Sequence, residues 1–191
     1  AVSSTHKNSE TDGDTATIYV NGVLMKSVPA WVNYEGIEAT GYDTLNLELM
    51  MAADDPAVKR INLVFDTPGG QVAGQIDVAK AIAEINQTKP ITAYISDMCC
   101  SGGYWLASQC GEIFAKPNSA IGSIGVYCTY YDMSKMAEDA GIKVLVISSG
   151  ELKGMGVPGA PISEKQIADM QKYVDALGAN FVDAVSVGRN K

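Results

Sequence analysis

Histidine is nearly absent from this chain: its 191 residues include only His6, which lies in a polar N-terminal segment. A Ser-His-Asp hydrolase uses histidine as its general base, and here the N-terminal segment would have to supply it. We therefore expect any nucleophilic serine in this chain to use a base other than histidine.

Basic residues are also scarce, since 14 Lys and Arg stand against 22 Asp and Glu, for a formal net charge of −8. No basic cluster offsets this balance, so binding a phosphate backbone is not expected as the main task. No apolar run approaches the length of about 20 residues that a membrane-spanning helix needs. We therefore expect no nucleic-acid partner and no membrane segment within this chain.

Metal-ligand spacing is missing among the four cysteines, which are Cys99, Cys100, Cys110 and Cys128. We expect free thiols in a reducing compartment and no metal site. The glycine pairs lack the Lys-Ser/Thr ending of a phosphate-binding loop, so nucleotide binding is not expected either. The sequence predicts no cofactor.

Apolar runs typical of strands alternate with amphipathic stretches typical of helices. This order favours an α/β fold, a mostly parallel sheet with covering helices and with its sites at the strand ends. We expect a disordered tail over residues 1–15 and one domain over residues 16–191. The expected strands lie at 15–25, 60–65, 91–96, 112–115, 126–131 and 144–147, and the expected helices at 43–53, 74–87, 104–109, 132–140 and 163–187.

Ser101 occupies the junction between the expected strand at 91–96 and the expected helix at 104–109. A serine at a sharp strand-to-helix turn exposes its hydroxyl, and Gly102 and Gly103 leave room for a substrate backbone. The first amides of the helix would then point to where an oxyanion forms. The same residues also fit an N-cap serine followed by flexible glycines, and this segment alone does not separate the two readings.

A second glycine-rich strand end, Pro68-Gly69-Gly70, precedes Ser101 by about one strand-helix unit. If the two strands are neighbours, a Gly-Gly amide could face Ser101 and, with the Gly102 amide, form a two-donor oxyanion hole. The alternative is a tight turn, since Pro-Gly is a common turn dipeptide.

With histidine excluded, the candidate base is a lysine held neutral by desolvation. Lys153 differs from the other lysines because it lies in a long Gly/Pro-rich loop, residues 148–161, directly after an expected strand. An ordinary solvated surface lysine remains the alternative.

Four motifs occur in a specific order along residues 16–190: Asp66-Thr-Pro-Gly-Gly with Val72-Ala-Gly, Asp97-Met-Cys-Cys-Ser-Gly-Gly, Gly122-Ser-Ile-Gly-Val and Ser149-Gly-Glu-Leu-Lys. Together they resemble the signal peptide peptidase A family of Ser-Lys proteases, especially its lambda-type phage head-maturation branch. The resemblance implies a fold of the Clp protease/crotonase type. It also implies that Ser101 is the nucleophile and that Lys153, 52 residues downstream, is the general base.

The resemblance extends to residues around this dyad. It implies that Ser123 orients the lysine and that the amides of Gly70 and Gly102 form the oxyanion hole. Extended substrate is expected to pair with backbone on two segments, as an added strand. The residues expected to bind substrate are Gly69, Gln71, Val72, Ile124, Gly125 and Val126.

The resemblance further implies a homo-oligomeric ring in which subunits share active sites. Because the family continues for some tens of residues beyond the position of Lys191, we expect the domain to be incomplete at its C-terminus.

The main hypothesis is a phage or prophage endopeptidase that trims proteins during head assembly, in the host cytoplasm or procapsid. One alternative is a bacterial signal peptide peptidase, membrane-associated through a segment outside this chain. The other is a non-proteolytic member of the fold, either a crotonase-type acyl-CoA enzyme or an inactive scaffold.

Overall fold

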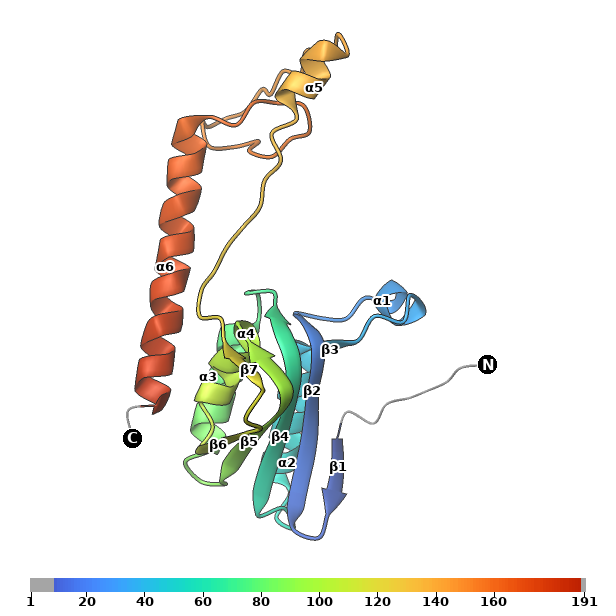
Figure 1. Cartoon of the computed structure of the whole chain (residues 1–191), viewed down its shortest axis with the longest axis vertical. Helices are drawn as coiled ribbons and strands as arrows, with labels where there is room; N and C mark the ends of the chain where they lie inside the picture. Colours follow the sequence, from blue (N-terminus) through green and yellow to red (C-terminus); the bar gives the residue numbers. More distant parts are fainter. Residues whose placement is uncertain (1–8, 190–191) are drawn as a thin grey trace. The chain divides into compact units, whose positions relative to one another are not determined.

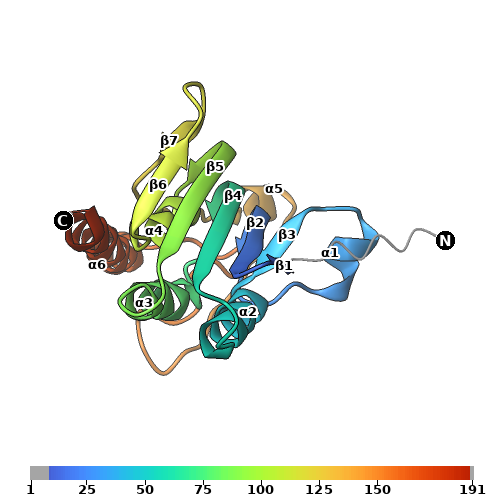
Figure 2. The same cartoon turned by 90° about the horizontal axis from the view of Figure 1, so that it is seen from below.

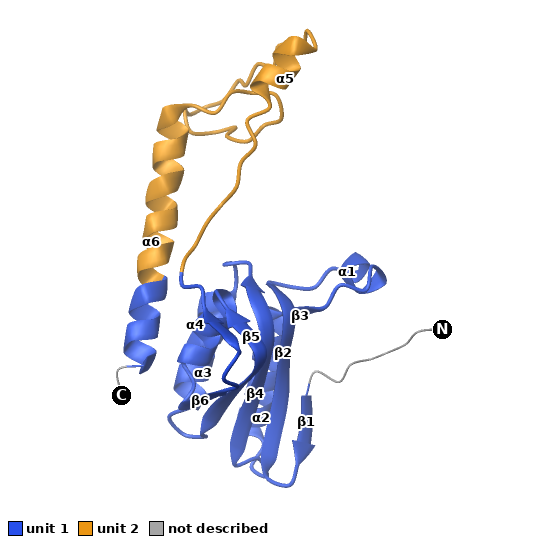
Figure 3. Cartoon of the chain, in the orientation of Figure 1, with its two compact units in different colours: residues 1–124, 181–191 blue, residues 125–180 orange. Residues whose placement is uncertain are grey.

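The computed structural model describes residues 9–189, which divide into two compact units (Figure 3). The first unit is drawn from residues 1–124 and 181–191, and the second is residues 125–180. Residues 16–191, which we expected to form one domain, therefore contribute to both units.

The first unit is built on a seven-stranded sheet with the order β1-β2-β4-β5-β6, in which β3 also pairs with β2 and β7 with β5 (Figure 1). Every pairing is parallel except that of β1 with β2. The expected α/β class with a mostly parallel sheet is therefore confirmed. The strands are β1 Ser9–Asp12, β2 Thr15–Met25, β3 Ala39–Gly41, β4 Arg60–Gly70, β5 Ile91–Cys100, β6 Glu112–Ala115 and β7 Ala120–Gly122.

The core of the first unit lies between this sheet and the helices on one of its faces. Alternate residues of the central strands point inward and are fully buried, as the period of two of a strand requires. Helices α2 (Tyr42–Asp54) and α3 (Gln75–Ile85) lie side by side against that face (Figure 2). The largest fully buried side chains include Ile18, Leu24, Tyr42, Leu45, Leu49, Ile61, Leu63, Phe65, Ile82, Ile91 and Leu106.

Two shorter helices complete the first unit. Helix α1 (Ala30–Tyr34) lies outside the helices expected from the sequence, and α4 (Gly102–Ser108) follows β5 directly. The C-terminal part of the long helix α6 (Glu164–Arg189) packs on α4, where the rings of Trp105 and Phe181 stack at 4.7 Å. Truncating Phe181 to alanine would cost about 3–5 kcal/mol by the usual penalty for a core aromatic.

The second unit contains α5 (Ser134–Asp139) and the N-terminal part of α6. The start of α6 is a capping box: the Gln166 amide N–H donates to Ser163 Oγ at 3.2 Å, and the Ser163 amide donates to Gln166 Oε1 at 3.0 Å. Near α5, hydrogen bonds from Ser134 and from the Ile162 amide hold the pKa of Asp132 below its ordinary value. Helix α6 therefore begins with a side-chain capping box, whereas the N-cap residue of α5 is Met133 and makes no side-chain capping bond.

The strands expected at 126–131 and 144–147 are wrong, because neither segment forms regular secondary structure. Their apolar side chains are instead exposed: Leu145 is 71% and Ile147 97% exposed. A strand needs a neighbouring strand for its backbone hydrogen bonds, and the second unit provides none within its described residues.

Two strands are longer than expected. Strand β4 continues from Phe65 through Pro68 to Gly70, and β5 continues from Ser96 to Cys100. Pro68 is tolerated in β4 although it has no N–H, and pairing with β2 resumes after a register shift at Asn21/Val23.

The N-terminal tail, expected to be disordered over residues 1–15, holds β1 at Ser9–Asp12 and the start of β2 at Thr15. A hydrogen bond of 2.7 Å from the Tyr19 hydroxyl to Glu10 joins β1 to β2. Residues 1–8 of that tail lie outside the described residues, as does His6. No helix between residues 9 and 189 is both long and apolar enough to cross a bilayer.

Candidate active site

Ser101 lies at the junction between β5 and α4 with φ 49° and ψ −124°. For a residue with a side chain this backbone conformation is uncommon and strained by about 1–3 kcal/mol. Its amide donates to the carbonyl of Gly122 at 2.8 Å, and its carbonyl accepts from the Trp105 amide at 3.1 Å. The turn is thereby fixed from both sides, and its hydroxyl has no capping bond to α4. Ser101 thus occupies the N-cap position of α4, but its side chain makes no capping hydrogen bond.

Gly69, near the end of β4, touches this turn. A Cβ on Gly69 would lie 2.6 Å from the Cβ of Ser101 and 2.8 Å from the Gly102 amide nitrogen. Gly69 also has φ 94°, so both its backbone angle and the available space favour glycine. The strands that carry the two glycine-rich ends are therefore neighbours in the sheet, which is the arrangement that the oxyanion-hole hypothesis requires.

The amide of Gly69 is not available as an oxyanion donor, because it donates to Thr67 Oγ1 at 3.0 Å. Gly70 lies opposite Leu24 of β2, and Gln71 donates to the Leu24 carbonyl at 2.8 Å. A Cβ on Gly70 would overlap the backbone of Leu24, so this strand end lies tightly against β2 and only glycine fits there. The role of the Gly70 amide as an oxyanion donor stays a prediction.

The Gly122-Ser-Ile-Gly segment lies beside the serine turn. Strand β7 pairs with the end of β5, with Cys100 opposite Gly122. Ser123 has φ 53°, and it and Ser101 are the two non-glycine residues with positive φ among residues 9–189. Both predicted serines therefore occupy strained turns at one end of the sheet.

Lys153 belongs to the second unit and is exposed there. Its amide donates to the Gly150 carbonyl at 3.1 Å, and the loop continues through Gly154 and Gly156, both with positive φ. Each unit is described by itself, so the pairing of Lys153 with Ser101 stays a prediction.

The residues expected to bind substrate are divided in the same way. Ile124 belongs to the first unit with Gly69, Gln71 and Val72, whereas Gly125 and Val126 belong to the second. The backbone of Gln71 is occupied on both sides: its amide donates to β2, and its carbonyl accepts from the Tyr42 hydroxyl at 2.9 Å. A substrate strand beside β4 would therefore use the backbone of other residues than Gln71.

Sequence reasoning missed three side chains around the serine turn. Thr67 is fully buried, donates to the Gly22 carbonyl at 2.6 Å and contacts Gly103 through its methyl group. Tyr42 and Gln75 both approach Gly102. Thr67 lies within the Thr-Pro-Gly-Gly motif and could have been noticed, whereas the other two lie in helices that carry no local signal of a site.

Cys99 and Cys100 precede the serine directly. Cys99 is completely buried, and this burial raises the pKa of its thiol. The thiol therefore stays protonated and does not compete with Ser101 as a nucleophile. Residues 9–189 contain no group of three or more His, Cys, Asp or Glu side chains placed to hold a metal ion.

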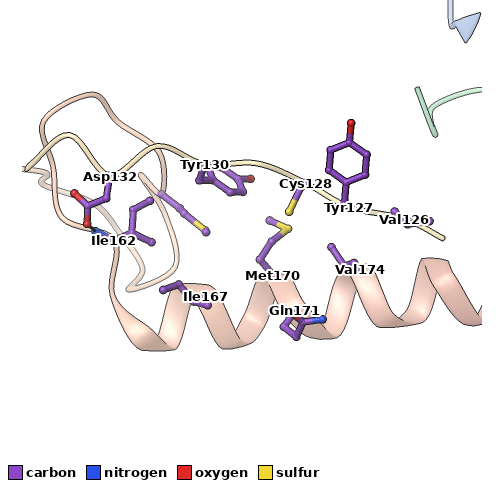
Figure 4. Close-up of a pocket in the computed structure, with 11 residues that line it drawn as sticks. Val126, Tyr127, Cys128, Tyr130, Asp132, Ile162, Ile167, Met170, Gln171 and Val174 are labelled. Atoms are coloured by element: carbon purple, nitrogen blue, oxygen red, sulfur yellow. Dashed lines mark hydrogen bonds between the residues drawn. The ribbon is translucent and has the colours of Figure 1, made fainter. Parts of the chain in front are cut away.

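The second unit contains a pocket of about 500 Å³ between the segment at 126–132 and helix α6 (Figure 4). Its lining is mainly apolar and includes Val126, one of the residues expected to bind substrate, and Met155, two residues after Lys153. Other lining residues are Tyr127, Cys128, Tyr130, Asp132, Ile162, Ile167, Met170, Gln171 and Val174.

A mostly parallel sheet with a serine turn and a glycine-rich strand end at one edge defines an α/β protein with a candidate nucleophile. Comparison with protein-family models then gives the family: residues 83–191 match the model of peptidase family S49, so the chain belongs to that family. Among solved structures, a variant of HypX from Aquifex aeolicus shares a TM-score of 0.45 at 19% identity, over 58% of this chain and 22% of its own.

Curated relatives include two phage proteins. The capsid assembly protease C of Escherichia phage lambda is 35% identical over 90% of this chain and 38% of its own length. The head-tail preconnector protein GP5 of Enterobacteria phage P21 is 33% identical over 90% of this chain and 34% of its own. Protease 4 of Salmonella typhi is 28% identical over 95% of this chain and 28% of its own. The chain thus spans less than two fifths of the length of these relatives.

Proposed function

We propose that this chain is a serine endopeptidase in which Ser101 is the nucleophile and Lys153 the general base. The observation that carries the proposal is the turn at Ser101, where a strained serine backbone touches the glycine pair at the end of β4. Strain of this kind persists only where the surroundings enforce it, and it is concentrated at active sites. Membership of peptidase family S49 supports the same assignment.

In the proposed mechanism neutral Lys153 takes the proton of the Ser101 hydroxyl as its oxygen attacks a peptide carbonyl. The amides of Gly70 and Gly102 donate to the oxyanion, and Ser123 orients the lysine. Lys153, now charged, gives its proton to the leaving amine, and the carbon–nitrogen bond breaks. Water then hydrolyses the acyl-enzyme, with Lys153 again as the base.

This mechanism requires Lys153 to be neutral, and a lysine becomes neutral near pH 7 only when it is desolvated. Within the second unit Lys153 is exposed, so its burial must come from elsewhere. The same unit exposes the apolar segments 126–131 and 144–147, which have strand-forming sequences without strand partners. We propose that a second copy of the chain covers these segments, in a ring whose subunits share active sites.

The substrate is proposed to be an extended peptide. It would add a strand beside Gly69–Val72 and beside Ile124–Val126. The pocket lined by Val126 and Met155 is apolar and lies in the unit of Lys153, which supports a preference for small or apolar side chains.

Among proteases, the proposed role is phage head maturation, acting in the host cytoplasm or procapsid. The two phage relatives support it, being 35% and 33% identical, against 28% for Protease 4. Degradation of cleaved signal peptides is the second candidate, because a putative signal peptide peptidase of Enterococcus faecium is 30% identical over 90% of this chain.

Labelling with a fluorophosphonate probe tests the dyad without a known substrate. Wild type should form one adduct, located at Ser101 by mass spectrometry, and Ser101→Ala should form none. Lys153→Arg should label at least 100-fold more slowly, because a guanidinium cannot act as a base at usable pH.

Lys172→Arg is the matched control, since Lys172 is an exposed lysine of α6, and it should label like wild type. An adduct on another residue, or rapid labelling of Lys153→Arg, would contradict the proposed dyad.

A further inference from the structure

Tyr42 begins helix α2 and is almost completely buried, with 1% of its surface exposed. Its hydroxyl donates to the carbonyl of Gln71 at 2.9 Å. Gln71 directly follows Gly70, whose amide is one of the two proposed oxyanion donors. The hydroxyl therefore holds the strand end that carries one of the two proposed oxyanion donors.

The same phenol oxygen also lies beside Gly102, whose amide is the other proposed donor. It lies 3.1 Å from the position that a Cβ on Gly102 would occupy. Because Gly102 has no side chain, the hydroxyl can approach its backbone this closely. One oxygen atom is thus bonded to Gln71, next to Gly70, and lies beside Gly102, so it adjoins both segments that supply the proposed oxyanion amides.

The position of the Tyr42 ring is itself fixed. Its Cδ2 and Cβ atoms lie 3.4 Å and 3.5 Å from the site of a Cβ on Gly74, the residue that precedes α3. Burial raises the pKa of the phenol, so the hydroxyl keeps its proton and remains a donor to Gln71 at any pH at which the protein works.

Gln75 provides a comparison at the same place. It is 3% exposed, and its Oε1 lies 3.3 Å from the position of a Cβ on Gly102. Its Nε2 is buried without a hydrogen-bond partner among residues 9–189. Gln75 thus packs against Gly102 as Tyr42 does, but it makes no side-chain hydrogen bond to the strand end at Gly70–Gln71.

From this arrangement we infer that Tyr42 is a positioning residue, whose hydroxyl sets the separation between the amides of Gly70 and Gly102. The inference rests on the proposed function, because it assigns Tyr42 to the oxyanion hole of that site. Tyr42 touches neither substrate nor reacting atoms. A change of a few tenths of an ångström in donor spacing weakens hydrogen bonds that form fully only in the transition state, so it slows the chemical step more than it weakens binding.

The test compares Tyr42→Phe with Gln75→Met by the kinetics of fluorophosphonate inactivation. The phosphoryl oxygen of this probe develops charge in the oxyanion hole as Ser101 attacks. Tyr42→Phe keeps the ring but loses the bond to Gln71, so the maximal inactivation rate should fall about tenfold while the probe's binding constant stays within twofold. Tyr34→Phe, at an exposed tyrosine of α1, should match wild type.

Gln75→Met removes a polar group at the same contact without breaking a hydrogen bond in the structure. It should inactivate within twofold of wild type, and its melting temperature should rise because a buried donor without an acceptor is removed. All rates are measured well below the melting temperature of each variant, so that a loss of stability alone leaves them unchanged.

Unchanged inactivation of Tyr42→Phe, or an equal loss in Gln75→Met, would overturn the inference. If Tyr42→Phe labels as fast as wild type while Ser101→Ala fails to label, the inference fails and the proposed function stands. If wild type itself forms no adduct at Ser101, both fail together.

Discussion

Ser101 keeps a positive φ that a side chain disfavours, although a glycine at this position would relieve the strain. Selection for stability alone would favour the glycine. The serine is therefore expected to be retained for its hydroxyl, at a cost in stability.

This predicts that Ser101→Gly is more stable than Ser101→Ala by about 1 kcal/mol, although both variants lack the hydroxyl and are inactive. The estimate subtracts the entropy that glycine loses on folding from the relieved strain. Urea unfolding of the two variants measures the difference. In the interior of α6 glycine should instead be less stable than alanine, so Ala176→Gly should lower the free energy of unfolding by about 0.5–1 kcal/mol. Equal stability of the two Ser101 variants would show that the turn is not strained.

The sequence marks the candidate catalytic residues more clearly than the residues around them. Ser101 and Lys153 lie in glycine-rich motifs, where the sequence itself limits the backbone. Tyr42 lies 59 residues before Ser101, and its place beside Gly102 depends on how α2 packs on the sheet. Tertiary contacts of this kind have no local pattern, so only the structure reveals them.

Strand β4 is the element that joins the two glycine motifs. Its last residues pair with β2 on one side, and Gly69 meets the Ser101 turn on the other. The distance between the strand end and the serine turn is therefore set by contacts that leave no room for a side chain at Gly69.

Gly69→Ala should accordingly destabilise the protein by about 2–5 kcal/mol and abolish fluorophosphonate labelling. The penalty combines a strained positive φ with overpacking against Ser101 and Gly102. Gly36→Ala is the matched control, because Gly36 also has positive φ but has nothing within 4 Å of its Cβ position. Gly36→Ala should lower the free energy of unfolding only by the cost of a positive φ in alanine, about 1–2 kcal/mol, and should still be labelled by the fluorophosphonate. Equal losses in urea unfolding would mean that the close contact at Gly69 is unimportant.

Elements with a local signal were predicted well. Helices α2 and α3 and strand β6 lie within two residues of their expected bounds, because amphipathic periodicity and short apolar runs mark them. The ends of β4 and β5 were placed too early, since Pro-Gly-Gly and Met-Cys-Cys resemble the ends of strands. The segments 126–131 and 144–147 have strand-like sequences, but a strand forms only when another strand lies beside it.

At the scale of the whole molecule, the candidate dyad is divided between two units, with Ser101 in the first and Lys153 in the second. If the ring supplies the burial that Lys153 needs, activity depends on assembly. Dilution should then lower the labelling rate per chain in parallel with dissociation followed by light scattering.

The most direct test of the shared site mixes two inactive variants. Lys153→Ala retains Ser101, and Ser101→Ala retains Lys153, and neither should react alone with the fluorophosphonate. In mixed rings some interfaces would combine an intact serine with an intact lysine from the other chain. We predict that an adduct then appears at Ser101 of the Lys153→Ala chain, identified by its mass. No adduct in rings whose subunits demonstrably exchange would contradict the shared site.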